Sequence, residues 1–485
     1  MESKAAPAKK HFTFKKWIAS AVLLYLLYIF CTSVFPFLRS KTVSEAFAST
    51  VSVSDFYSDT PCTDRAALVE TPAEGFDTRI HILDGAQARI DVSYYALHMG
   101  ETTDLFLGAL LDAADRGVQV RILVDGQFGG LTYYNRAYAA AIGAHPNIEL
   151  KIYNPPNPLK PWTWNGRLHD KYIIIDNRLL LMGGRNIGDK YFGPDGYDKP
   201  LSYDRDVLIY NTAWEDGGGD SVLFAVRDYM DSLWDSPNVR LPFEKDTKSA
   251  ASKRQALQTG FQDFRSERPA LFDHTGDDYE SWTHPTNRVT FFHNDTNIGV
   301  KEPKTGYVLG QLLRQAESNV VLQSPYVILD STLDTLLRDL GEKQINAAVL
   351  TNSAASSPNP TACAAYLGDR KTIANTGVRL LEYQGENSIH AKTYLIDDRL
   401  SVVGSYNLDP RSAYIDTEMM LVIDSVAFTR ELKQVQDTYR QQALEVTGDG
   451  RYLPREDLEE RPLPFAKKVM LWLLFLPVRL FKQLT

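Results

Sequence analysis

The chain between residues 60 and 445 alternates short apolar segments with amphipathic ones, and the alternation occurs twice. In the first half, apolar residues at helical spacing, among them Leu107, Leu111 and Ala114, predict a helix that covers a sheet and ends at Gly117. In the second half, predicted strands at 320–322 and 347–350 flank another helix, which ends near Gly341. This alternation predicts an α/β fold of two similar units, each with a mixed or parallel sheet flanked by helices.

A long uncharged run near the N-terminus predicts a membrane anchor. Residues 17–38 carry no charge and are long enough to cross the hydrocarbon core, which takes about 20 residues. Arg39 and Lys41 follow the run, whereas five lysines precede it: Lys4, Lys9, Lys10, Lys15 and Lys16. The positive-inside rule then places residues 1–16 in the cytosol and the two predicted α/β units on the outer side of the inner membrane. A signal peptide cleaved near Ala46-Phe47-Ala48 stays open as the alternative.

The C-terminal residues 462–485 predict a second membrane contact. An apolar stretch there is too short to span, is interrupted by Pro477, and is mixed with basic residues: Lys467, Lys468, Arg479 and Lys482. Insertion at the membrane interface, with these side chains at headgroup level, is expected. Docking of the same helix on the protein core is the alternative.

Composition narrows the function classes. The chain has 485 residues, 44% of them hydrophobic, which suffices for a large core in two lobes. A net charge of −9 and a pI near 5.6 disfavour a nucleic-acid partner, unless a local basic channel overrides them. Residues 240–290 are polar and interrupt the repeat, which favours a linker or insertion, in the simplest case a solvated connector.

The cysteines and histidines give no sign of a metal site. Cys62 and Cys363 could form a disulfide outside the cytosol, but the sequence does not tell whether they meet. No Cys/His spacing resembles a zinc site, so neither a metal nor another cofactor is expected.

One short polar pattern recurs at the equivalent point of both halves. His169, Lys171 and Asp176 of the first copy return as His390, Lys392 and Asp397. At matching spacing, each histidine is followed by a glycine, a small residue and an asparagine: Gly183, Gly184 and Asn186, then Gly404, Ser405 and Asn407. A single copy would be weak evidence, but two copies in the same register predict one shared site.

The residue types in this pattern suit chemistry at phosphorus. In each copy the histidine and lysine are at i and i+2 and enter an apolar strand (172–175 and 393–396), so both side chains point to one face. Two facing half-sites would bind a phosphate through the lysines, the asparagines Asn186 and Asn407, Ser405, and backbone N–H groups at Gly184. One histidine would attack phosphorus and the other would protonate the leaving oxygen. Asp176 and Asp397 are expected to anchor turns and not to contact phosphate.

The two patterns resemble the paired HKD motifs of the phospholipase D superfamily. The longer phrases GGRNIGDKYF and GSYNLDPRS are most similar to bacterial cardiolipin synthases with an N-terminal anchor, and the resemblance covers residues 60–440. It implies a bilobed pseudo-dimer with one shared active site, with lobes at 60–239 and 291–445. It also implies phosphatidyl transfer through a phosphohistidine, with His169 as nucleophile and His390 as acid by motif order, and it permits a small accessory protein.

Each histidine is expected to need an acid at its far ring nitrogen, which fixes the tautomer and stabilises the imidazolium. Glu418 matches the family's downstream acidic position. Asp206 aligns with it in the first half, because strand-like residues follow both, and Asp204 is the weaker choice.

Three functions remain as alternatives. The first is transfer of a phosphatidyl group from phosphatidylglycerol to the hydroxyl of a second phospholipid, which gives cardiolipin; phosphatidylethanolamine is another candidate substrate. The second is hydrolysis to phosphatidic acid. A nuclease or an inactive membrane scaffold comes third, because both motifs are intact and the anchor is present.

Overall fold

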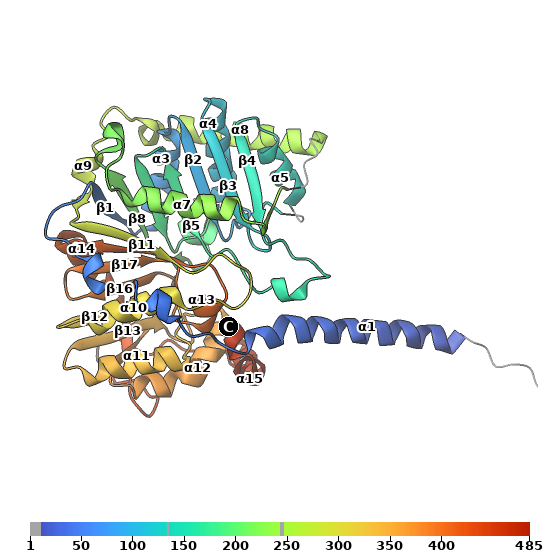
Figure 1. Ribbon diagram of the computed structural model, residues 1–485, viewed down its shortest axis with the longest axis vertical. Helices are drawn as coiled ribbons and strands as arrows, with labels where there is room; N and C mark the ends of the chain where they lie inside the picture. The colour runs from blue at the N-terminus through green and yellow to red at the C-terminus, as the bar shows by residue number, and fades with distance from the viewer. Residues whose placement is uncertain (1–10, 133–134, 243–246) are drawn as a thin grey trace, which may run out of the picture.

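Two lobes with the same architecture are stacked in the computed structural model, which describes residues 11–132, 135–242 and 247–485 (Figure 1). The helix α1 (His11–Val34) projects away from them. The predicted α/β fold of two similar lobes with an N-terminal apolar helix is confirmed.

The first lobe is built around one mixed sheet. Its strands lie in the order β10-β1-β8-β6-β5-β2-β3-β4-β9. β2, β3 and β4 are parallel to one another, whereas β5, β6, β8 and β1 pair antiparallel. The bounds are β1 (Asp64–Val69), β2 (Arg89–Tyr94), β3 (Gln119–Asp125), β4 (Ile148–Tyr153), β5 (Lys171–Ile175), β6 (Leu179–Gly183), β8 (Asp206–Asn211), β9 (Val239–Arg240) and β10 (His284–Pro285).

The second lobe repeats this sheet except for the edge strand β10, which has no counterpart there. Its order is β11-β18-β17-β16-β12-β13-β14-β19, so β5 corresponds to β16, β6 to β17 and β8 to β18. The bounds are β11 (Arg288–His293), β12 (Asn319–Gln323), β13 (Asn346–Asn352), β14 (Arg379–Tyr383), β16 (Lys392–Ile396), β17 (Leu400–Gly404), β18 (Met419–Asp424) and β19 (Ala443–Val446). β5 and β16, which follow the two histidines, are buried at every position, as central strands are.

Helices cover both faces of each sheet. The outer faces carry α3 (Pro72–Asp84) and α4 (Glu101–Asp115) in the first lobe, and α10 (Lys304–Arg314) and α11 (Ser331–Glu342) in the second. The remaining bounds are α2 (Glu45–Ala48), α5 (Arg136–Gly143), α6 (Asp189–Phe192), α9 (Tyr279–Trp282), α12 (Pro360–Ala374), α13 (Pro410–Tyr414), and the 3₁₀ turns η1 (Phe35–Phe37), η2 (Val53–Phe56), η4 (Pro161–Thr163), η5 (Trp214–Asp216), η6 (Pro269–Phe272) and η7 (Lys482–Leu484).

The polar segment between the lobes is not a solvated connector. Its helix α8 (Lys248–Glu267) lies across α4 and buries Leu257 and Phe261 in the core of the first lobe. Gly108 of α4 allows the close approach, because a Cβ there would lie 2.7 Å from the Cβ of Phe261. A few apolar side chains on one face were enough to dock a helix whose overall composition is polar.

The inner faces of the two sheets meet in a common core. α7 (Val222–Trp234) and α14 (Val426–Gln441) lie there, with Tyr172 and Ile174 of β5 in the same cluster as Leu395 of β16. A short parallel sheet of β7 (Ser202–Tyr203) and β15 (Ser388–Ile389) also joins the lobes, directly before His390. The two halves of the repeat are therefore one packed body, which brings the motifs together.

The end of α1 that joins the lobes and the C-terminal helix α15 lie at the same side of the second lobe (Figure 1). Residues Phe14–Phe37 are long and apolar enough to cross a membrane, and side chains along α1 are exposed. The C-terminal helix α15 (Phe465–Leu480) continues through Pro477, docks on α12 through Leu471 and Val478, and exposes most of its other apolar side chains. The three cysteines, all in described parts of the chain, are free thiols, so Cys62 and Cys363 do not pair here.

Candidate active site

His169 and His390 come from different lobes and line the same cavity, of about 660 Å³. Each lies two residues before the first residue of the corresponding central strand, β5 or β16. The other lobe holds each backbone in place: His169 N donates to Thr417 Oγ1 at 2.8 Å, and His390 N donates to the Tyr203 carbonyl at 2.6 Å. The two half-sites expected from the repeat thus face one space.

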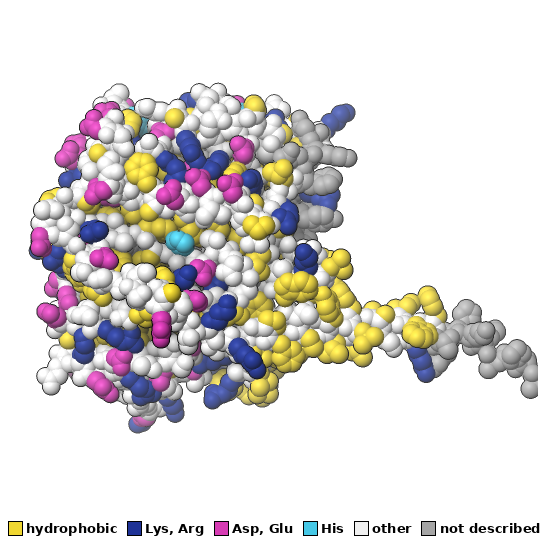
Figure 2. Space-filling view, viewed as in Figure 1, with side chains coloured by type: hydrophobic (Ala, Val, Ile, Leu, Met, Phe, Trp, Pro, Cys, Tyr) yellow, Lys and Arg dark blue, Asp and Glu magenta, His cyan; other side chains and the backbone are white. Residues whose placement is uncertain are grey.

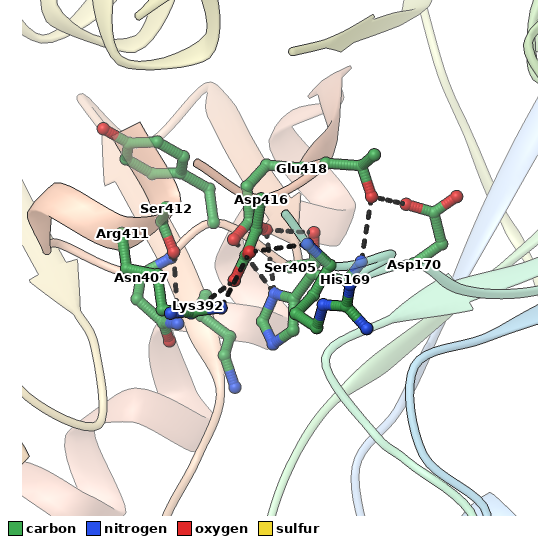
Figure 3. Close-up of polar contacts among 12 residues, drawn as sticks. His169, Asp170, Lys392, Ser405, Asn407, Arg411, Ser412, Asp416 and Glu418 are labelled. Carbon is green, nitrogen blue, oxygen red and sulfur yellow. Dashed lines mark hydrogen bonds and ion pairs between the residues drawn. The ribbon is translucent and has the colours of Figure 1, made fainter. Parts of the chain in front are cut away.

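The ring of His169 pairs with Glu418 of the second lobe (Figure 3). Its Nδ1 lies 3.0 Å from both carboxylate oxygens, and Ser405 Oγ donates to Oε2 of the same carboxylate at 2.5 Å. Burial raises the pKa of Glu418 to about 8. Burial, with the charge of Lys171, holds the pKa of His169 well below its ordinary value. Because Nδ1 faces the acid, Nε2 is the nitrogen left for chemistry.

The ring of His390 pairs with Asp204 of the first lobe. Its Nδ1 lies 2.5 Å from Asp204 Oδ2, and Lys392 Nζ lies 3.7 Å from the same oxygen. Burial alone would raise the pKa of Asp204, but Lys392 and His390 outweigh it and the pKa is lowered. Burial, followed by the charge of Lys392, lowers the pKa of His390 to about 3. The free site therefore holds a neutral His390 beside an ionised Asp204.

The expectation that Asp206 orients a histidine is wrong. Asp206 is fully buried between two arginines: Arg79 donates to its Oδ1 at 2.9 Å, and Arg185 Nε donates to its Oδ2 at 2.9 Å. These buried guanidinium groups need its charge, and Asp206 holds them within the first lobe.

Strand register shows why Asp204 and not Asp206 corresponds to Glu418. Gly183 of β6 pairs with Asp206, whereas the equivalent Gly404 of β17 pairs with Met420. Asp206 therefore matches Met420, and the residue two positions earlier is the acid in both lobes. The strand-like residues after both acids pointed to Asp206 in the sequence, and the register of β8 and β18 in their sheets is what identifies Asp204. The pairing is also crossed, since each histidine uses the acid of the other lobe.

The two motif lysines are buried beside the histidines. Lys171 Nζ donates to the carbonyl of His169 at 2.6 Å, and Lys392 Nζ makes the same bond to the carbonyl of His390. Burial, with the nearby charge of Lys392, lowers the pKa of Lys171 to about 7, and burial lowers the pKa of Lys392 as well. A phosphate anion placed beside them would favour their charged forms.

Asn186 and Asn407 occupy equivalent places in the cavity wall. Asn186 Nδ2 donates to the Tyr191 hydroxyl at 3.1 Å, and Asn407 Nδ2 donates to Ser412 Oγ at 3.3 Å. Both side-chain carbonyl oxygens are buried and accept no hydrogen bond from the described residues. An unpaired acceptor in such a position is costly unless a ligand or water satisfies it, so both can receive a hydroxyl of a substrate.

Gly184 and Ser405 lie behind the histidines and not in the cavity wall, which corrects the expectation that they bind substrate. The N–H groups of both are already used, because they donate to the carbonyls of Arg205 and Met419 in the sheets. Gly184 leaves room for Asp204, whose Oδ1 would be 2.3 Å from a Cβ at that position. Ser405 contacts Glu418 instead, so both residues act on the acids.

The motif aspartates lie at hairpin turns with positive φ, +52° at Asp176 and +54° at Asp397. Asp176 accepts backbone N–H groups from Gln87, Ala88 and Arg89, at 2.8 to 3.0 Å, and thereby ties the β5–β6 turn to the start of β2. Asp397 accepts the equivalent N–H groups of residues 317–319 before β12. These contacts are those of turn anchors.

The cavity wall also contains residues that the motif analysis did not single out. The Tyr95 ring lies edge-on to His169 with centroids 4.9 Å apart, and the Tyr191 ring is 5.9 Å from His390. Lys190 and Arg411 also line the wall, where Arg411 is paired with Asp416. Three of these residues, Tyr191, Lys190 and Arg411, fall inside the longer phrases GGRNIGDKYF and GSYNLDPRS, so those phrases held the signal.

Three comparisons with known proteins agree with this geometry. Residues 80–213 and 309–439 match the family described as cardiolipin synthase, PLD-like domain. Cardiolipin synthase C of Escherichia coli K12 is 30% identical over 395 residues, 74% of this chain and 80% of that one. A cardiolipin synthase of Staphylococcus aureus Mu50 is 26% identical over 365 residues, 74% of this chain and 64% of that one. The crystal structure of phosphatidylserine synthase from Haemophilus influenzae has a similar fold, with a TM-score of 0.61 at 18% identity over 87% of this chain and 95% of that one.

Proposed function

The chain belongs to the cardiolipin synthase family with phospholipase D-like domains, and from that premise we propose that it joins two phospholipids into cardiolipin through a phosphohistidine. Family membership makes it a phospholipase D-type phosphatidyltransferase of phospholipids. The proposal adds the route and the roles of the residues. It rests on one observation above all, the two histidines that face one cavity while each is paired to the acid of the other lobe.

In the first step, Nε2 of His169 attacks the phosphorus of phosphatidylglycerol and the bond from phosphorus to the glycerol oxygen breaks. Glu418 accepts the Nδ1–H of His169, which keeps Nε2 unprotonated and stabilises the positive charge that forms on the ring. The phosphate anion favours the protonated form of His390, whose Nε2 then gives a proton to the departing glycerol. Lys171 and Lys392 offset the charge that develops on the remaining phosphate oxygens.

In the second step, the hydroxyl of another phospholipid loses its proton to Nε2 of His390 and attacks the same phosphorus. The bond between phosphorus and His169 breaks, and both histidines return to their starting states. The free carbonyl oxygens of Asn186 and Asn407 are suited to hold the hydroxyl groups of the two alcohols. Water in the place of the second lipid would give phosphatidic acid, so transfer requires that the acceptor exclude water.

The apolar surface beside the cavity supports action at a membrane. Hydrophobic side chains cover α1 and the surface at its root (Figure 2). Phe30 of α1 contacts Phe481 with ring centroids 5.8 Å apart, and the Tyr28 hydroxyl donates to the carbonyl of Leu159. The exposed side chains of α15 include Trp472 and Leu476, and Leu484 at the end of the chain lines the cavity. We propose that α1 spans the inner membrane with the lobes outside, and that α15 lies in the interface so that lipids enter sideways.

The activity test is to incubate the purified full-length protein with phosphatidylglycerol and phosphatidylethanolamine, alone and mixed, and to identify the products by mass spectrometry. Cardiolipin that disappears in both His169→Ala and His390→Ala is the expected result, and the mixtures reveal the donor and the acceptor. Phosphatidic acid without cardiolipin would establish a hydrolase instead. No lipid product in any mixture, with or without cell extract as a source of an accessory protein, would overturn the proposal.

The orientation of the lobes is tested with a membrane-impermeant maleimide on spheroplasts, whose inner membrane is intact. The labelled variant carries Asp457→Cys, at an exposed position, and has its own three cysteines replaced by serine. Labelling before lysis is expected, because the lobes lie outside. Labelling only after lysis would place them in the cytosol.

A further inference from the structure

A cluster of histidines and carboxylates lies where the inter-lobe segment returns to the first lobe, and none of its members lines the catalytic cavity. His81 belongs to α3, while His274 and Asp277 lie between η6 and α9. His81 Nε2 is 2.9 Å from Asp277 Oδ1, and His274 Nδ1 is 2.8 Å from Asp277 Oδ2. One ligand atom of each residue lies within 4.8 Å of the others.

The hydrogen bonds around these rings need more donors than neutral histidines have. Nδ1 of His81 faces the carbonyl of Leu271 at 2.8 Å and must carry a proton, yet Nε2 faces a carboxylate. Nε2 of His274 faces Asp84 at 3.0 Å, and its Nδ1 also faces a carboxylate. A neutral imidazole has only one N–H, so with both carboxylates ionised each ring must be an imidazolium or bind a cation through its second nitrogen.

Two imidazolium rings are the less favourable solution, because the ring centroids of His81 and His274 lie only 4.3 Å apart. Like charges at that distance repel in a half-buried site. A metal ion between the rings removes the conflict, since each ring then stays neutral and gives one lone pair to the ion.

We propose that Nε2 of His81, Nδ1 of His274 and a carboxylate oxygen of Asp277 bind one Zn²⁺ ion, with water as the fourth ligand. Two histidines and one carboxylate are a familiar zinc ligand set. Tetrahedral bonds of about 2.0 Å place ligand atoms about 3.3 Å apart, so the N–O separations of 2.9 and 2.8 Å need to open only slightly to admit the ion. Zinc-binding histidines usually donate their other N–H to a carboxylate or a backbone carbonyl. Asp84 and the carbonyl of Leu271 supply these two acceptors.

The ion would fasten the inter-lobe segment to α3. This segment contains α8 and α9 and leads directly into β10 and β11, so it connects one lobe to the other. The predicted role is structural and separate from the chemistry at His169 and His390. Sequence spacing did not reveal the site, because His81 lies in the first lobe and His274 lies far along the chain in the inter-lobe segment.

The test measures zinc in the full-length protein, purified through a tag without histidines and dialysed against ZnCl₂ and then metal-free buffer. About one zinc per chain is expected in the natural protein and in the control His145→Gln, whose histidine pairs with Asp115 elsewhere on the surface. His81→Gln and His274→Gln should each lose the ion. Zinc should also raise the midpoint of thermal unfolding by several degrees in the natural protein and not in these two variants.

Two results would overturn the proposal. One is a natural protein that retains no more zinc than the His81→Gln, His274→Gln double variant and whose unfolding midpoint is the same with zinc and with chelator. The other is zinc retained equally by all variants, because the ion would then be bound elsewhere. Circular dichroism of each variant shows that it is folded before its metal content is compared.

Discussion

The two halves of the active site are built from the same parts but differ at the acid. His169 is paired with Glu418, the acid with the longer side chain, and burial raises the pKa of Glu418 to about 8. The second histidine, His390, has the shorter Asp204, which Lys392 and His390 keep ionised in spite of its burial. The small residue behind the acid differs as well: Ser405 donates to Glu418, whereas Gly184 only makes room for Asp204.

This difference suggests a division of labour between two nearly symmetric groups. A permanently ionised Asp204 stabilises an imidazolium, which suits the group that gives and takes protons. Glu418 has a pKa near neutral pH, so its ionisation determines the fraction of His169 whose Nε2 is unprotonated. This suits the nucleophile. The predictions below test this asymmetry.

The largest effect is expected at the histidines. His169→Ala and His390→Ala should each lower the rate of phosphatidyl transfer by about 10⁴-fold or more, because the pair acts as a unit. A donor with a nitrophenolate leaving group, which needs no protonation, should restore leaving-group release only in His390→Ala. Absorbance measures the released nitrophenolate and so distinguishes the nucleophile from the acid. Restored release in His169→Ala instead would mean that His390 is the nucleophile and His169 the acid.

The second-largest effect is expected at the two acids. Glu418→Gln and Asp204→Asn should each lower kcat by about 10³-fold. Their pH profiles should differ. Because Glu418 is protonated below its pKa of about 8, its ionisation should give kcat/KM of the natural protein a limb that rises with pH up to about 8, while the loss of the Lys171 charge above its pKa of about 7 lowers kcat/KM at high pH. Asp204→Asn should keep this rise and Glu418→Gln should lose it. A rise that survives in Glu418→Gln would show that another group titrates there.

Asp206, which begins β8 two positions after Asp204, should affect folding and not the chemical step. Asp206→Asn leaves Arg79 and Arg185 buried without their carboxylate, which costs about 3–5 kcal/mol of stability. The exposed pair of Asp77 with Arg268 on the same side of the lobe is the matched control, and Asp77→Asn should cost less than about 1 kcal/mol. Urea unfolding midpoints measure both. A folded Asp206→Asn protein with unchanged stability and little turnover would contradict this and show that Asp206 acts in the chemical step.

The smallest effect is expected at Ser405. Ser405→Gly makes the second lobe resemble the first and removes one hydrogen bond to a charged acid, worth about 1.5 kcal/mol, or roughly tenfold in rate. Because that bond lowers the pKa of Glu418, its loss should move the rise in kcat/KM to higher pH. A profile that keeps its midpoint would mean that Ser405 does not act on the acid.

Much of this site could be predicted from the repeat. Matching spacing after His169 and His390 placed both histidines, both lysines and both asparagines in one site, because equivalent positions of a repeated sheet face each other in a pseudo-dimer. The crossed pairing of acids could not be read in the same way. It depends on how β7 and β15 join the lobes, and on a strand register that shifts the acid from Asp206 to Asp204.

The inter-lobe segment shows a second limit of sequence patterns. Its polar composition favoured a solvated connector, yet Leu257 and Phe261 dock α8 against Gly108 of α4. Whether a polar helix with a narrow apolar stripe docks depends on the surface that the stripe contacts. That surface forms only when the first lobe has folded.

The most direct test of the division of labour is to trap the intermediate. His390→Ala is mixed with the nitrophenyl donor and quenched with base, which preserves phosphohistidine, and its peptides are mapped by mass spectrometry. Without His390 to activate an acceptor, the phosphatidyl group should accumulate on His169. A phosphatidyl group found on His390 in the matching experiment with His169→Ala, and none on His169, would contradict the account.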